Sequence, residues 1–81
     1  MKETETMLTK VDIYGTKHHL EMLDKSKWFV NPIDLPTVAT WIPASTIIIR
    51  KIKEDLVFSY QITNLSDDVS ILAMKIRKIK K

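Results

Sequence analysis

Apolar residues along this chain come in short, β-branched runs separated by polar turns. The two clearest runs are residues 46–52 and residues 56–62. Successive side chains on a strand point to opposite faces, and Val, Ile, Phe and Tyr suit a pleated, half-buried surface. These runs therefore predict two strands, and Phe58, Tyr60 and Ile62 share the inner face of the second.

Three shorter strands are expected before these two, over residues 9–14, 17–23 and 28–30. Polar residues separate the second from the third, which predicts a hairpin. Gly15, the only glycine in the chain, marks a turn or bulge where a positive φ would be tolerated. The residues expected on the inner face of these strands are Val11, Ile13, Leu20, Met22, Trp28 and Val30.

Residues 31–45 interrupt the strand pattern. This segment holds all three prolines, none of which can donate a hydrogen bond to a sheet. Asp34 is suited to cap a short helix, with Pro36 in its first turn. We therefore expect one or two helical turns that plug an open end of the sheet, with Leu35, Val38 and Trp41 on the buried side.

The C-terminal residues can be interpreted in two ways. Residues 69–79 contain apolar positions at helical spacing, with acidic residues before them and basic residues at their end. Residues 70–76 can instead form a last strand with Leu72, Met74 and Ile76 inward. We predict the strand, because a sixth strand lets a small barrel close whereas five leave an edge exposed.

The predicted fold class is all-β: five or six antiparallel strands in a strongly bent sheet or partly open barrel, SH3-like or OB-like, with one short helical turn. An α+β fold with a C-terminal helix is the alternative. We expect residues 1–8 to form a disordered leader, 9–76 a single soluble domain and 77–81 a basic tail. The predicted core comprises Val11, Ile13, Leu20, Met22, Trp28, Val30, Leu35, Val38, Trp41, Ile47, Ile49, Phe58, Tyr60, Ile62, Leu72 and Met74.

The net charge of +3 is unevenly distributed. The first seventy residues carry eight basic and ten acidic side chains, so their balance is 8 − 10 = −2. Any attraction to phosphate therefore lies near the C-terminus. The chain has no cysteine, which excludes disulfides and thiolate metal sites. No apolar run approaches the roughly 20 residues that cross a bilayer.

Candidate reactive groups are sparse. His18 and His19 are neighbours, so on a strand they point to opposite faces and cannot share one metal ion. His19 and Glu21 supply two ligands where a structural zinc site needs four, so we expect one half-buried and one surface histidine and no metal site. No nucleophile elbow, phosphate loop or paired-histidine motif is present. We expect no catalytic residues and no cofactor.

The candidate contact residues are aromatic or basic. Trp28 and Phe29 are adjacent, so one of them faces inward and the other outward, and the core is the expected place for Trp28. An outward ring beside basic residues would stack on single-stranded nucleic acid. The candidate binding residues are Phe29, Trp41, Lys75, Arg77, Lys78, Lys80 and Lys81.

These observations favour a small non-catalytic binding module with a protein partner. A weak nucleic-acid-binding domain that uses the basic tail and an exposed aromatic is the alternative, and a small enzyme subunit is a distant third. Homodimerisation is plausible if residues 46–52 form a long unpaired edge strand. The compartment is open: the cytoplasm is the default, and a secreted or periplasmic location follows if a signal peptide has been removed.

Overall fold

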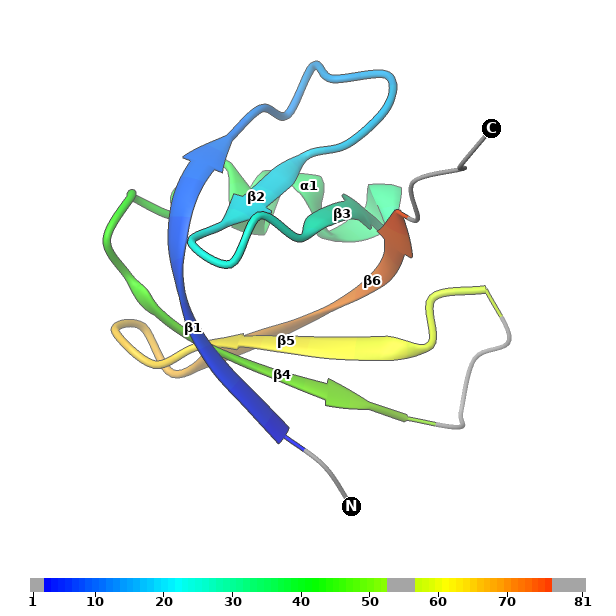
Figure 1. The fold of residues 1–81 in the computed structure, drawn as a ribbon. Helices are drawn as coiled ribbons and strands as arrows, with labels where there is room; N and C mark the ends of the chain where they lie inside the picture. Colours follow the sequence, from blue (N-terminus) through cyan, green and yellow to red (C-terminus); the bar gives the residue numbers. More distant parts are fainter. Residues whose placement is uncertain (1–2, 53–56, 77–81) are drawn as a thin grey trace.

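The computed structural model describes residues 3–52 and 57–76 of the chain. Six antiparallel strands close into a barrel in the order β1-β2-β3-β6-β5-β4 (Figure 1), which confirms the all-β prediction. A 3₁₀ helix (η1) and a single turn of α-helix (α1) connect β3 to β4. The elements are β1 (Glu3–Val11), β2 (Leu20–Met22), β3 (Lys27–Val30), η1 (Pro32–Asp34), α1 (Leu35–Val38), β4 (Thr46–Lys51), β5 (Tyr60–Asn64) and β6 (Val69–Ile76). None of the described helices is long and apolar enough to cross a membrane.

The first strand begins earlier than the sequence pattern predicted. β1 starts at Glu3 and its first five residues pair with β4, from Glu3 opposite Arg50 to Met7 opposite Thr46. The predicted disordered leader is therefore wrong for residues 3–8. Thr and Glu alternate there, and this polar alternation does not predict a buried strand because neither face is apolar.

β1 also pairs with a second strand. From Leu8 to Val11 it lies against β2, and the register shifts between Leu8 and Lys10. Such an irregularity bends a strand and increases its twist. The bend allows β1 to leave β4 and join β2, and this closes the barrel.

The strands around residues 46–62 are shorter than predicted. β4 pairs on both sides, with β1 and with β5, so it is no free edge for a second copy of the chain. The predicted basis for a homodimer is therefore wrong.

β5 begins only at Tyr60, and Phe58 is half-buried outside the main core rather than inside it. Leu56 lies outside the described residues.

The last element is the predicted strand and not the alternative helix, but its inner face differs from the prediction. Ile71 and Ala73 are buried, whereas Leu72 and Met74 are only partly covered. The β5–β6 hairpin sets this register by pairing Asn64 with Val69, which places Ile71 opposite the buried Ile62.

A local turn makes that register possible. Asp68 has a φ of 55°, a left-handed conformation that Asp tolerates better than most residues. The Asn64 side chain accepts a hydrogen bond from the Ser66 amide at 2.9 Å. The turn shifts the register of β6 by one residue from the predicted one, so Ile71 and Ala73 face inward in place of Leu72 and Met74.

The helical segment is anchored differently from the prediction. Asn31, rather than Asp34, provides the side-chain cap, by accepting the Ile33 amide at 3.2 Å. The Asp34 carboxylate instead accepts the Leu72 amide of β6 at 3.2 Å. This hydrogen bond links the helical segment to β6. Val38, the last residue of α1, is fully buried.

Gly15 lies in the predicted turn, but the reason for a glycine there differs from the expected one. Its φ is not positive; instead a Cβ at this position would collide with the carbonyl oxygen of His18. The β1–β2 loop therefore needs glycine for close backbone approach.

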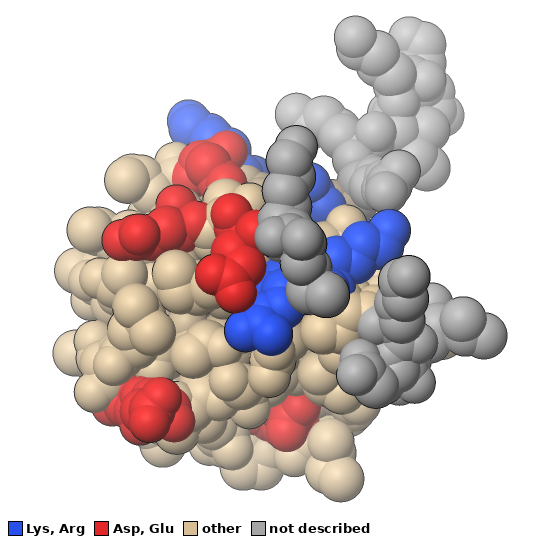
Figure 2. Space-filling view, turned by 90° about the horizontal axis from the view of Figure 1, so that it is seen from below, with Lys and Arg blue, Asp and Glu red and all other residues tan. Residues whose placement is uncertain are grey.

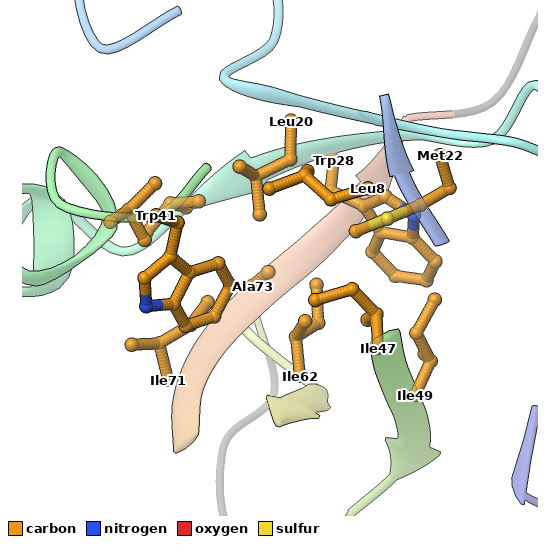
Figure 3. Packing of buried hydrophobic residues seen from close by; sticks show 12 residues of the cluster. Leu8, Leu20, Met22, Trp28, Trp41, Ile47, Ile49, Ile62, Ile71 and Ala73 are labelled. Atoms are coloured by element: carbon orange, nitrogen blue, oxygen red, sulfur yellow. The ribbon is translucent and has the colours of Figure 1, made fainter. Parts of the chain in front are cut away.

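One cluster of buried apolar side chains fills the interior of the barrel. Figure 3 shows Trp41 at one end of it and Trp28 at the other, with Ile62 and Ala73 between them. Most predicted core residues are present, and the structure adds Leu8, Ile71 and Ala73. Val11, Ile13, Leu35 and Tyr60 pack against the cluster from partly buried positions. The buried members are Leu8, Leu20, Met22, Trp28, Val30, Val38, Trp41, Ile47, Ile49, Ile62, Ile71 and Ala73.

The face of β6 can be tested with adjacent substitutions. Ile71→Ala removes a buried side chain and leaves a cavity, so we expect a loss of about 2–5 kcal/mol in the free energy of unfolding. Leu72→Ala, on the opposite face, should cost less than ~1.5 kcal/mol. Urea denaturation of both variants measures the difference. Equal losses would contradict the observed register.

Candidate functional site at the mouth of the barrel

One end of the barrel opens into a hollow of about 300 Å³, which we call the mouth. The far end is filled by Val38 and Trp41, so the two ends of the barrel differ. The mouth is lined by Thr4, Asp24, Ser26, Trp28, Ile49, Lys51, Tyr60 and Lys75.

Two lysines occupy inward-facing positions at the mouth. Lys51 lies two residues after the buried Ile49, and Lys75 lies two residues after the buried Ala73. Because side chains two apart on a strand share a face, both lysines continue the core face. Their ladder partners are aromatic: Lys51 pairs with Tyr60, and Lys75 pairs with Trp28.

The aromatic rings form the floor beneath these lysines. The Trp28 and Tyr60 rings meet edge to face, with centroids 5.0 Å apart and an interplanar angle of 70°. Lys75 Nζ lies 5.9 Å from the Trp28 centroid, and Lys51 Nζ lies 6.0 Å from the Tyr60 centroid. A cation over a ring face is attracted by about 0.5–1 kcal/mol at exposed sites. The rings therefore help to hold both ammonium groups at the mouth.

The β2–β3 turn supplies the acidic lip of the mouth. The Trp28 indole donates to Ser26 Oγ at 2.9 Å, and the Ser26 hydroxyl donates to Asp24 Oδ1 at 2.6 Å. The hydrogen bond from Ser26 is the main cause that lowers the pKa of Asp24, and Lys75 adds to it. The turn therefore presents an ionised carboxylate near Lys75, in a hollow that Lys51 also lines. Figure 2 shows basic side chains gathered on one half of a barrel face with acidic ones directly beside them.

The structure divides the candidate binding residues predicted from the sequence. Lys75 belongs to the mouth. Trp41 is only 4% exposed and belongs to the core, so it is not an exposed contact ring. Phe29 is the outward member of the Trp28–Phe29 pair, half-buried on the other side of the sheet. Arg77, Lys78, Lys80 and Lys81 lie outside the described residues.

Of the residues that line the mouth, only Lys75 was among the predicted contacts; Trp28, Lys51 and Tyr60 were not. Trp28 and Tyr60 were assigned to the core, and both do pack there. Lys51 carried a readable signal, because it follows Ile47 and Ile49 at a spacing of two. Lys75 was expected on the outer face of the last strand, because Leu72, Met74 and Ile76 were predicted to point inward, whereas the structure places it at the mouth.

His19 is a structural hydrogen-bond acceptor on the outer side of the β2–β3 hairpin. Only 3% of it is exposed, its ring lies 4.4 Å from that of Phe29, and its Nδ1 accepts the Val30 amide at 3.0 Å. His18, which is partly exposed, lies 3.7 Å from Glu21. Among residues 3–52 and 57–76, no three His, Asp, Glu or Cys side chains come together as metal ligands.

Comparison with protein-family models, with curated proteins and with solved structures found no match to this chain. A barrel by itself does not define a function, because one fold hosts many activities. The chemistry of the mouth is therefore the basis for the proposal that follows.

Acidification should weaken the fold through His19. Burial lowers the pKa of His19 from 6.5, more than the nearby Asp12 carboxylate raises it. The unfolded chain therefore binds a proton at His19 more readily than the folded chain does. The contribution of neutral His19 to the free energy of unfolding is complete above pH 6.5 and is lost as the pH falls below that value. Urea denaturation between about pH 7.5 and pH 5 should show declining stability.

Two variants isolate the residue responsible. His19→Asn removes the titrating ring and should flatten the decline, whereas His18→Asn should preserve it. The assignment fails if the slopes of wild type and His19→Asn are the same.

Proposed function

We propose that this protein is a small non-catalytic protein-binding module whose mouth receives an acidic side chain of its partner. The observation that carries the proposal is the pair of inward-facing lysines, Lys51 and Lys75, at the open end of a closed barrel. Mouths of β-barrels are recurrent ligand sites, in which a few polar groups set specificity within an apolar surround.

The charges at the mouth favour an anionic group. Of the described acidic residues, only Asp24 lines the mouth, so two ammonium groups share one carboxylate. A carboxylate from a ligand would receive charge-assisted hydrogen bonds, which are shorter and stronger than neutral ones. The aromatic floor and Ile49 would pack against the methylenes of the same side chain.

The geometry supports a protein ligand over a nucleic acid at this site. Single-stranded nucleic acids gain about 1–3 kcal/mol per base by stacking on exposed rings. Trp28 is only 2% exposed, so it offers no stacking surface. A hollow of about 300 Å³ suits a side chain better than a stacked run of bases.

Titration of the mouth with a minimal acidic peptide tests the proposal. The capped tripeptide Glu-Gly-Glu should shift the NMR signals of Lys51, Tyr60, Lys75 and the Trp28 indole. The double variant Lys51→Gln/Lys75→Gln should weaken this binding about threefold to tenfold, since each partly exposed ion pair contributes modestly. The peptide Gln-Gly-Gln should bind no better to wild type than to this variant.

A matched control holds the net charge constant. Lys10→Gln/Lys17→Gln removes two exposed lysines away from the mouth, and it should retain wild-type affinity. If both double variants lose the same affinity for Glu-Gly-Glu, the binding depends on net charge and not on the mouth, and the proposal is overturned. Tighter binding of oligo-dT that survives the mouth variant but not removal of residues 77–81 would favour the nucleic-acid alternative.

A further inference from the structure

The N-terminal half of β1 is flanked by only one strand among the described residues. On one side, Glu3–Met7 pairs with β4; on the other, β2 joins only from Leu8 onward. The last backbone contact on this second side is the Leu23 amide, which donates to the Met7 carbonyl at 2.8 Å. In Figure 1, the β2–β3 turn ends beside the middle of β1, and the blue strand continues below it.

The backbone of Glu5 faces this open side. Leu8 donates to the Ser45 carbonyl and accepts from the Ala44 amide, so its polar groups point toward β4. The direction of the backbone N–H and C=O groups alternates from residue to residue along a strand. These groups of Met7 and Glu5 therefore point away from β4. Within residues 3–52 and 57–76, no backbone hydrogen bond reaches Glu5 from that side.

Two hollows that share Asp24 lie along this edge. A second hollow of about 600 Å³ is lined by residues of β1, by Leu23 and by Asp24, and Asp24 also lines the mouth. Thr6 of β1 lines this second hollow, and Thr4, two residues before it on the same face of the strand, lines the mouth. An extended chain placed against the edge would therefore run from Leu23 into the mouth.

We propose that the free edge of β1 binds an extended segment of a partner protein by strand addition, and that side chains of this segment alternate between basic and acidic. This inference rests on the proposed function, because the acidic side chains would enter the mouth. Side chains of an added strand alternate between the two faces of the sheet. On the outer face they would meet Glu3 and Glu5, which favours Lys or Arg there; on the inner face they would meet Lys51 and Lys75, which favours Asp or Glu.

The same charges disfavour a second copy of this chain as the occupant. Antiparallel self-pairing of two β1 edges centred on Glu5 would place the two Glu5 side chains directly opposite each other. Like charges opposite each other destabilise a strand pair. A partner segment with complementary alternation avoids this repulsion.

The backbone contact can be tested with two substitutions at one position. Glu5→Pro removes the free amide donor, and proline is tolerated at a strand edge whose N–H faces solvent. Glu5→Thr removes the same charge but keeps the donor. The probe is the capped peptide Lys-Glu-Lys-Glu-Lys-Glu, and the block peptide Lys-Lys-Lys-Glu-Glu-Glu is its composition-matched control.

The alternating peptide should bind wild type more tightly than the block peptide does. Glu5→Pro should weaken that binding about threefold to tenfold relative to Glu5→Thr, the value of one lost hydrogen bond. In wild type, the Glu5 amide should exchange with solvent more slowly when the peptide is bound. This second measurement remains decisive if Glu5→Pro does not fold.

The possible failures are distinguishable. Equal affinity of the alternating peptide for Glu5→Pro and Glu5→Thr, with unchanged exchange at Glu5, would overturn strand addition even if the mouth lysines still bind Glu-Gly-Glu. Loss of Glu-Gly-Glu binding as well would remove the proposed function itself. A concentration-dependent dimer in sedimentation that Glu5→Pro dissociates would identify a second copy as the occupant and overturn the proposal.

Discussion

The barrel depends on a single bent strand that pairs with two different neighbours. β1 joins β4 through its first half and β2 through its second, and the change of partner occurs at Leu8. Leu8 is fully buried, and its amide and carbonyl are bound by the segment that leads into β4. Without this double pairing, β4 and β2 would both present unpaired edges, and the core between them would open to water. Closure is thus achieved by a strand whose first half is mainly polar.

The way in which the barrel closes also determines where it remains accessible. β2 has only three residues, too few to follow the whole length of β1. Among the residues that the structure describes, the mismatch leaves the first half of β1 paired on one side only, and the interior is open beside Thr4. The proposed ligand pocket and the proposed strand-addition edge are therefore two consequences of one geometric feature. A longer β2 would cover both.

Much of the fold was predictable because apolar alternation is a strong signal where one face is buried. Leu20 and Met22 were expected to face the third strand, and Leu20 does pair with Trp28. The pairing of residues 3–7 was not predictable, because their stability comes from backbone hydrogen bonds to β4 and not from an apolar face. The inner face of β6 was missed by one residue for a similar reason: the turn after Asn64, and not the apolar pattern, sets the register.

The candidate site was harder to predict than the fold, since it combines residues that are distant in sequence. Lys51 could be placed on an apolar face from its spacing alone, but its meeting with Lys75 depends on β5 and on the register of β6. The same register places Lys75 at the mouth and not on the outer face, where inward Leu72, Met74 and Ile76 would have put it.

The two ends of the barrel place opposite demands on their residues. At the end covered by the helical segment, Val38 and Trp41 exclude water, and burial of apolar surface contributes about 25 cal/mol per Å². At the mouth, inward positions that could extend this apolar core carry lysines instead. Both lysines are exposed, so their ammonium groups stay in contact with water and carry little desolvation cost. The ring contacts of Lys51 and Lys75 add a small stabilisation and hold the two charges at the open end. The mouth thus keeps two cations accessible to an anionic group, and this is the feature on which the proposed function depends.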